Sequence, residues 1–190
     1  PLISFLKKYF FHAMCKINHS TQGYLIAGET FSYGNGNSDG YLVKINNMGD
    51  TIWTHTYGGS NADVFNDVVE DDTGNIICIG TTYSNTLFGD GDIWIMKSDS
   101  LGNELWSYTF DDTLNDHGKC IIVANDGNYI FGGDNEHIEE YDALYSSIDP
   151  SGNLLWTNHY TGSADELSTA LVQHKDSSTY TFIGNSTTWG

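Results

Sequence analysis

The stretch from Gly23 to Gly59 decides the fold, and it reads GYLIAGETFSYGNGNSDGYLVKINNMGDTIWTHTYGG. It contains a short apolar run closed by Gly28, a second run that begins at Asp39, and a third that begins near Trp53. Each run is rich in aromatic and β-branched residues, and polar, glycine-rich residues separate the runs. This pattern is typical of short β-strands joined by tight turns.

The same landmarks recur along the chain in the same order, which indicates an internal repeat. The glycines that close an apolar run lie 52, 53 and 51 residues apart, at Gly28, Gly80, Gly133 and Gly184. The aspartates that open the next run are Asp39, Asp92 and Asp142. The tryptophans that follow a turn glycine by four residues are Trp53, Trp106 and Trp156.

A further apolar segment lies between each tryptophan and the next glycine-closed run, as in 64–69 and 120–124. Each period of about 52 residues therefore holds four strands, which is the pattern of a β-propeller blade. We predict an all-β fold, a β-propeller arc of about 3.5 four-stranded antiparallel blades and a fragment of a larger ring. The chain is expected to enter partway through a blade and to form one partial domain, 1–190, with blade portions of about 1–57, 58–110, 111–160 and 161–190.

A single four-stranded blade cannot cover both of its faces, so neighbouring blades must bury each other. We interpret Trp53, Trp106 and Trp156 as side chains that pack against the adjacent blade, because an aromatic ring supplies a large buried area. The alternative is a row of ligand-stacking platforms. The aspartates that open the third strands are expected to accept hydrogen bonds from backbone amides in the preceding turn.

The charge of the chain is strongly one-sided, with 25 acidic residues, 7 lysines, no arginine and a formal net charge of −18. Nucleic-acid binding requires basic residues for the phosphates, and anionic lipid surfaces attract cationic patches. We therefore expect neither a nucleic-acid partner nor membrane insertion.

No motif for a nucleophile elbow, a phosphate loop or an HExxH zinc site occurs in the sequence. Cys15, Cys78 and Cys120 are odd in number, lack CxxC spacing and lie in apolar runs, so we interpret them as core residues. Counted back from the closing glycines, His12 and His117 fall at equivalent repeat positions, which favours a repeated structural role over a metal pair. No cofactor is expected beyond calcium.

The calcium candidates lie in the loops that precede two of the third strands: Asn35, Asn37, Asp39, Asp90 and Asp92. Their alternating oxygen ligands and glycines resemble a calcium loop. A bidentate glutamate is missing at the twelfth position, where Asn46 stands. The alternative interpretation is a simple polar loop at the end of a blade.

The motifs between Gly23 and Gly59 resemble the tandem β-propeller repeats of bacterial secreted and cell-surface proteins, related to the SBBP repeats. The resemblance covers nearly the whole chain, although the third copy has Ser147 where the other two have Lys44 and Lys97. It implies an extracellular or cell-surface location and a structural repeat with no assigned reaction.

Two functions follow as expectations. The first is a non-enzymatic binding or scaffold module that recognises a protein or a glycan through blade-end loops such as 29–38 and 82–91, with the remaining blades of the chain completing the ring. The alternative is part of a polysaccharide hydrolase or lyase with its active site at the funnel of the ring. Carboxylates from three or more blades that converge in one pocket would favour the enzyme.

Overall fold

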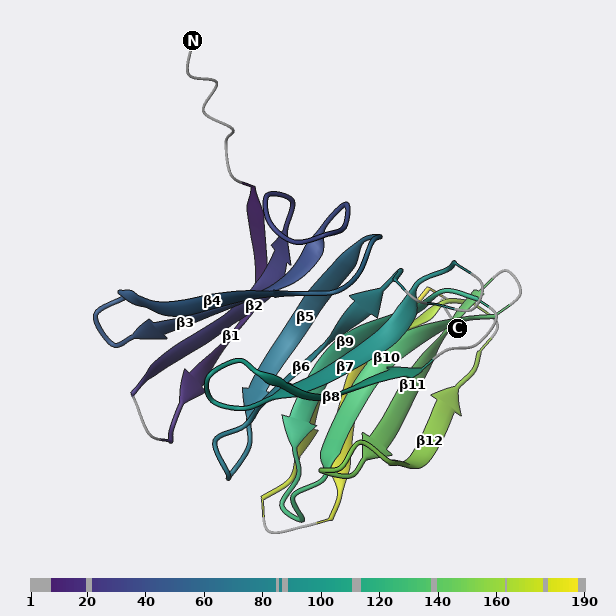
Figure 1. Ribbon diagram of the computed structural model, residues 1–190. Helices are drawn as coiled ribbons and strands as arrows, with labels where there is room; N and C mark the ends of the chain where they lie inside the picture. The colour runs from purple at the N-terminus through teal and green to yellow at the C-terminus, as the bar shows by residue number, and fades with distance from the viewer. Residues whose placement is uncertain are drawn as a thin grey trace.

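The computed structural model is built from β-strands, turns and loops. It describes residues 8–19, 22–84, 86, 89–110, 114–137, 140–162, 164–175 and 178–187, and no helix occurs among them. The strands form three four-stranded antiparallel sheets and one two-stranded sheet (Figure 1). The predicted all-β class and the arc of blades are therefore confirmed.

The strands follow each other in space as they do in the sequence. The first sheet contains β1 (Tyr9–Ile17), β2 (Gly23–Thr30), β3 (Asp39–Asn46) and β4 (Thr51–Tyr57). The second sheet contains β5 (Asp63–Glu70), β6 (Ile76–Thr82), β7 (Asp92–Ser98) and β8 (Glu104–Phe110). The third sheet contains β9 (Asp116–Val123), β10 (Tyr129–His137), β11 (Glu140–Ile148) and β12 (Leu154–Tyr160). The half-sheet contains β13 (Glu166–Gln173) and β14 (Tyr180–Ser186).

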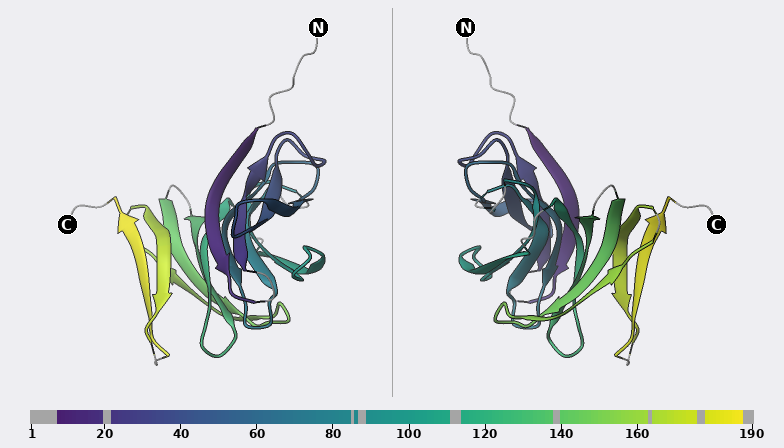
Figure 2. Two further views of the ribbon diagram at one scale, coloured as in Figure 1. Left: turned by 90° about the vertical axis from the view of Figure 1, so that its left-hand side faces the viewer. Right: turned by 90° about the vertical axis from the view of Figure 1, so that its right-hand side faces the viewer.

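The first strands of the sheets pack against one another. Strand β5 contacts β1 and β2, β9 contacts β5, and β13 contacts β9, so these strands form the inner side of the arc. Within the described residues the arc is open, with the first sheet at one end and the half-sheet at the other (Figure 2). The expectation that the chain enters partway through a blade is wrong, because β1 is the inner strand of a complete sheet.

Three hydrophobic cores fill the spaces between adjacent sheets. The first joins Leu25 and Leu42 to Phe65 and Trp94, and the second joins Ile95 of the second sheet to residues of the third. The tryptophans of the repeat pack against these cores, one at each: Trp53, Trp106 and Trp156. Their interpretation as scaffold residues is confirmed.

The closing glycines are explained by a bulge in the first strand of each sheet. The register shifts at the residue pairs next to these glycines, which pushes the neighbouring backbone toward them. A Cβ atom would overlap a carbonyl oxygen across the ladder at all four closing glycines: Phe10 O at Gly28, Val64 O at Gly80, His117 O at Gly133 and Leu167 O at Gly184. Only glycine fits there without a backbone shift.

The strand pairing shows that the predicted equivalence of His12 and His117 is wrong. His117 pairs with Asp134, one residue after its closing glycine, and the residue paired in the same place in the first sheet is Phe10. Between the turn and the closing glycine, each strand of the first hairpin is one residue longer than in the other hairpins, since Gly28 follows the turn by five residues and not four. Counting back from the glycine therefore misaligned the histidines.

Candidate functional site

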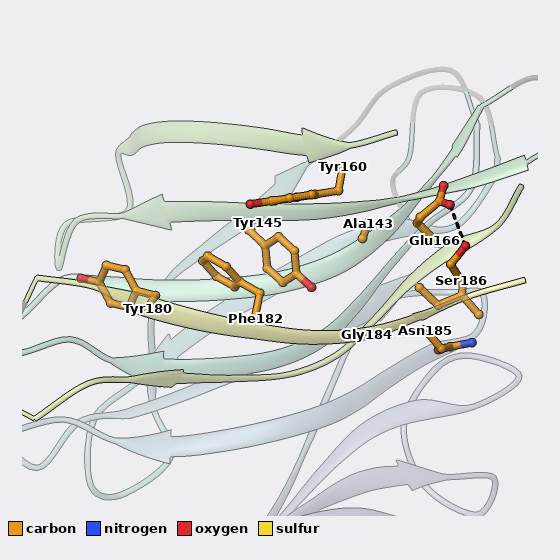
Figure 3. Close-up of a pocket in the computed structure, with 10 residues that line it drawn as sticks. Ala143, Tyr145, Tyr160, Glu166, Tyr180, Phe182, Gly184, Asn185 and Ser186 are labelled. Carbon is orange, nitrogen blue, oxygen red and sulfur yellow. Dashed lines mark hydrogen bonds between the residues drawn. The ribbon is translucent and has the colours of Figure 1, made fainter. Parts of the chain in front are cut away.

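An aromatic cleft lies between the third sheet and the half-sheet. Four rings form its walls: Tyr145 on β11, Tyr160 on β12, and Tyr180 and Phe182 on β14. We use the name aromatic cleft for the space that these four side chains line. Its lobe beside β13 and β14 has a volume of about 400 Å³ and also contacts Ala143 and Gly184 (Figure 3).

The rings of the aromatic cleft pack against one another at its base and leave its rim open. The centroids of Tyr145 and Phe182 are 3.9 Å apart, and Tyr160 meets Tyr145 edge to face at 5.8 Å. Tyr160 remains 58% exposed. Burial raises the pKa of the Tyr145 hydroxyl, which stays protonated near neutral pH. The cleft therefore offers apolar ring surface with hydroxyl donors.

One end of the cleft carries a carboxylate. Glu166, the first residue of β13, accepts a hydrogen bond of 3.0 Å from the Ser186 hydroxyl across the half-sheet (Figure 3). Its Oε2 atom is shielded from solvent and has no hydrogen-bond partner among the described residues. This end is thus polar, whereas the centre of the cleft is aromatic.

Glu166 belongs to a row of acidic residues that the sequence analysis missed. Asp63 and Asp116 occupy the same place at the start of the inner strands β5 and β9. Asp63 accepts hydrogen bonds from the Gly59 amide and the Ser84 hydroxyl, both at 2.8 Å, and Asp116 accepts one from the Asn135 amide at 2.6 Å. The three acidic residues are 53 and 50 residues apart, and this spacing could have revealed the row in the sequence. Their hydrogen bonds connect the ends of neighbouring strands.

The calcium candidates lie at the ends of the third strands. Asp39 is buried and accepts hydrogen bonds from the backbone amides of Asn35 and Gly36, at 3.3 and 3.0 Å, as expected for an aspartate that stabilises its turn. Asn35 and Asn37 are exposed, and Asp92 is fully buried in the second sheet. No group of three or more histidine, cysteine or acidic side chains in the described part of the chain could hold a metal ion.

The carboxylates of different sheets do not meet in the clefts we describe. A second cleft, of about 440 Å³, contains Glu140 and Asp142 beside His159, but both carboxylates come from β11. Among the described residues that line the aromatic cleft, Glu166 is the only acidic one. A cleft of about 380 Å³ at the first sheet is lined by tyrosines, threonines and His55. The convergence required for a hydrolase is not found in these spaces.

The buried nucleophiles and charges are also structural. The three cysteines are free thiols in or against the cores, and burial raises the pKa of Cys120 to about 11. Lys97 lies 3.2 Å from Asp71 and donates a hydrogen bond of 2.7 Å to the Tyr129 hydroxyl, which in turn donates to Asp71. This trio joins the second sheet to the third and lines none of the clefts above.

In addition, no helix in the described residues could cross a membrane.

Comparison with known proteins places the chain by fold alone. No protein family and no curated protein matches the sequence, so the resemblance to SBBP repeats stays a prediction. The chain is similar in structure to a protein of unknown function from Bacteroides caccae, with a TM-score of 0.54, 12% identity and coverage of 78% of this chain and 48% of the other. It is also similar to a eukaryotic initiation factor, with a TM-score of 0.51, 9% identity and coverage of 83% and 34%. The chain thus spans between a third and a half of the length of these structures, and at such identities the likeness shows an all-β architecture.

Proposed function

We propose that this chain is a non-enzymatic binding or scaffold module of a secreted or surface-associated bacterial protein, and that the aromatic cleft is its recognition surface. The observation that carries the proposal is the set of four rings at this cleft. Tyrosine is enriched among residues that dominate the energy of protein interfaces, because its rigid ring buries a large area and its hydroxyl finds a partner. Tyr160, which is more than half exposed, is the ring most available to a partner.

The polar end of the cleft supports recognition of a partner with hydrogen-bond donors. The carboxylate of Glu166 has one oxygen bound to Ser186 and a second that no described residue satisfies. Buried polar atoms are usually hydrogen-bonded, so an amide or hydroxyl from a bound partner is well suited to this oxygen. The volume of about 400 Å³ falls in the usual range of binding pockets.

The proposal is tested by screening the protein on glycan arrays and on arrays of surface proteins. The test compares the wild type with Tyr160→Ser, which removes an exposed ring from the cleft. The matched control is Leu105→Ser, which removes an exposed apolar side chain from β8 on another sheet. We expect Tyr160→Ser to weaken binding at least about tenfold, as truncation of an interface hot spot does, and the control to bind as the wild type.

Two results would contradict the proposal. One is the absence of binding to any surface component, and the other is equal binding by the two variants. Polysaccharide cleavage by the wild type, measured as new reducing ends or unsaturated products, would favour the hydrolase or lyase instead.

A further inference from the structure

The two complete interfaces between sheets reveal what occupies the place of the aromatic cleft elsewhere in the arc. Between the second and third sheets, Phe131 and Tyr129 take the positions of Phe182 and Tyr180, and Leu144 of the third strand β11 is completely buried beside them. In the interface before it, the corresponding third-strand residue is Trp94, which stacks on Phe65 at 4.5 Å. In both interfaces a large apolar residue of a third strand therefore enters this space.

The backbone register explains why this residue always fits. In the three complete sheets the residue two positions after the aspartate of the third strand pairs with a closing glycine: Tyr41 with Gly28, Trp94 with Gly80, and Leu144 with Gly133. The glycine has no side chain, so the large residue opposite it can lie over the second strand. The corresponding glycine of the half-sheet is Gly184, and it lines the aromatic cleft.

The half-sheet also has the backbone edge that a third strand needs. Strands β2, β6 and β10 are each paired on both sides, whereas β14 pairs only with β13 among the described residues. Its other edge, along Tyr180–Ser186, lies at the end of the arc (Figure 2). A strand edge beside which no further strand is described is a template for an added strand.

We propose that β14 and the aromatic cleft form an acceptor site for an extended peptide strand with the pattern of β3, β7 and β11. The strand adds antiparallel to β14, with an aspartate opposite Ser186 and a large apolar residue two positions later opposite Gly184. The apolar side chain enters the aromatic cleft beside the packed rings of Phe182 and Tyr145. Main-chain hydrogen bonds supply affinity, and the residue in the cleft supplies selectivity.

This inference rests on the proposed function, because it names the partner of the same cleft. Complementary geometry comes from the chain itself: Asp39, Asp92 and Asp142 pair with Thr30, Thr82 and Asn135, the residues two positions after the closing glycines. Ser186 stands two positions after Gly184. An incoming strand therefore meets at β14 the same order of partners that β3, β7 and β11 meet in their own sheets.

The test uses a fluorescein-labelled peptide of residues 92–110, which contains the β7–β8 hairpin, added to the whole chain. Binding is followed by fluorescence anisotropy and by hydrogen exchange of the amides in Tyr180–Ser186. The matched control is the same peptide with Trp94→Ser. We expect the parent peptide to slow exchange of the β14 amides at least about tenfold and to bind at least about tenfold more tightly than the control peptide, which keeps the backbone pairing but loses the side chain in the cleft.

Unchanged exchange in Tyr180–Ser186 at millimolar peptide, or equal affinity of the two peptides, would overturn the inference. Array binding that depends on Tyr160 would then still support the proposed function, so the two failures are distinguishable. A second copy of the chain is the competing occupant. Protection of β14 that rises with protein concentration, and that excess peptide does not replace, would assign the edge to self-association and also overturn the inference.

Discussion

At the scale of single residues, the closing glycines connect the sequence repeat to the geometry of the sheets. Each stands opposite a bulge in the inner strand, where a carbonyl oxygen approaches within the space of a Cβ atom at Gly28, Gly80, Gly133 and Gly184. The same glycine pairs with the large third-strand residue of its sheet, as Gly80 pairs with Trp94. One glycine therefore serves both the backbone of its own sheet and the packing between sheets.

Replacing Gly80 by alanine is expected to lower the free energy of unfolding by about 1–3 kcal/mol, because the added methyl group overlaps Val64 O and forces a backbone shift. The control is Gly49→Asn in an exposed turn. Gly49 has a φ of 87°, a conformation that asparagine tolerates, and no atom lies near the place of its missing side chain. The control should therefore lower the free energy of unfolding by only a few tenths of a kcal/mol, roughly the effect of a surface substitution. Urea titration measures both, and a loss at Gly80 no larger than at Gly49 would refute the steric explanation.

The carboxylate of Asp71 makes the stability of the chain sensitive to acid. Burial by itself raises its pKa, but hydrogen bonds from Thr73, Tyr129 and Asn75 together outweigh burial and hold the pKa well below the usual range. A depressed pKa contributes stability above the unfolded value of about 3.9, and that contribution is lost as the pH falls toward the folded value.

We therefore expect Asp71→Asn to destabilise the protein by about 3 kcal/mol at pH 7, since Lys97 is left as a buried charge without its partner. The difference from the wild type should shrink as the pH falls below about 4, where the wild-type carboxylate is also protonated. Urea titrations at several pH values measure this. Asp126→Asn, at an exposed turn, should change stability little at any pH, and a penalty at position 71 that is independent of pH would rule out the titration argument.

At the scale of elements, the hairpin turns between the third and fourth strands of the second and third sheets receive side chains from the preceding sheet. The Asp99 carboxylate stabilises its turn by accepting hydrogen bonds from the backbone amides of Leu101 and Asn103. Lys44 donates a hydrogen bond of 3.1 Å to the carbonyl of Ser100 in this turn, and Tyr57 donates one of 2.7 Å to Gly102. The recurring turn sequence is therefore explained by contacts between sheets as well as by its own geometry.

The lysine contacts between the second and third sheets should stabilise the fold more than the lysine contact between the first and second sheets. Lys97 reaches the carbonyl of Pro150 as Lys44 reaches Ser100, but it also forms the buried ion pair with Asp71. We expect Lys97→Met to lower the free energy of unfolding by about 3 kcal/mol, because Asp71 loses its cation. Lys44→Met, the matched change, loses one hydrogen bond and should cost about 1 kcal/mol. Equal effects in thermal or urea unfolding would show that the ion pair adds no stability.

At the scale of the whole molecule, the described arc has two uncovered ends. On the outer face of the first sheet, the rings of Tyr9, Phe11, Tyr33 and Tyr41 stack at centroid distances of 5.1 to 6.3 Å. At the other end, Ile183 of β14 is 51% exposed. Contiguous apolar surface and open strand edges favour association, whereas the net charge of −18 opposes it.

We predict that this 190-residue chain associates as its concentration rises and that NaCl strengthens the association by screening the charge. Light scattering should show a molecular mass that increases with protein concentration. Ile183→Lys should reduce the increase by placing a charge at the open end, and Leu105→Lys on β8 is the matched control. A monodisperse monomer at high concentration and high salt would contradict the prediction.

Local patterns in the amino-acid sequence predicted the strands and their grouping into sheets. Glycine-closed runs at a spacing of about 52 residues, followed by an aspartate-led run and a tryptophan-led run, predicted four strands per sheet. These signals are local, because alternating apolar residues and turn glycines act through neighbours only a few residues away. The positions of Trp53, Trp106 and Trp156 between sheets followed from the same repeat, since each sheet must cover the next.

The contacts between neighbouring sheets could be seen only in the folded structure. The trio of Lys97, Asp71 and Tyr129 joins residues that lie far apart in the chain. The longer first hairpin separates His12 from the place of His117, although both histidines stand 16 residues before their closing glycines. The aromatic cleft is likewise invisible in the sequence, because it exists where Tyr145 faces Phe182 and no third strand of the described chain covers β14. Side chains that meet across sheets depend on register and packing distance, and a periodic pattern along the chain carries neither.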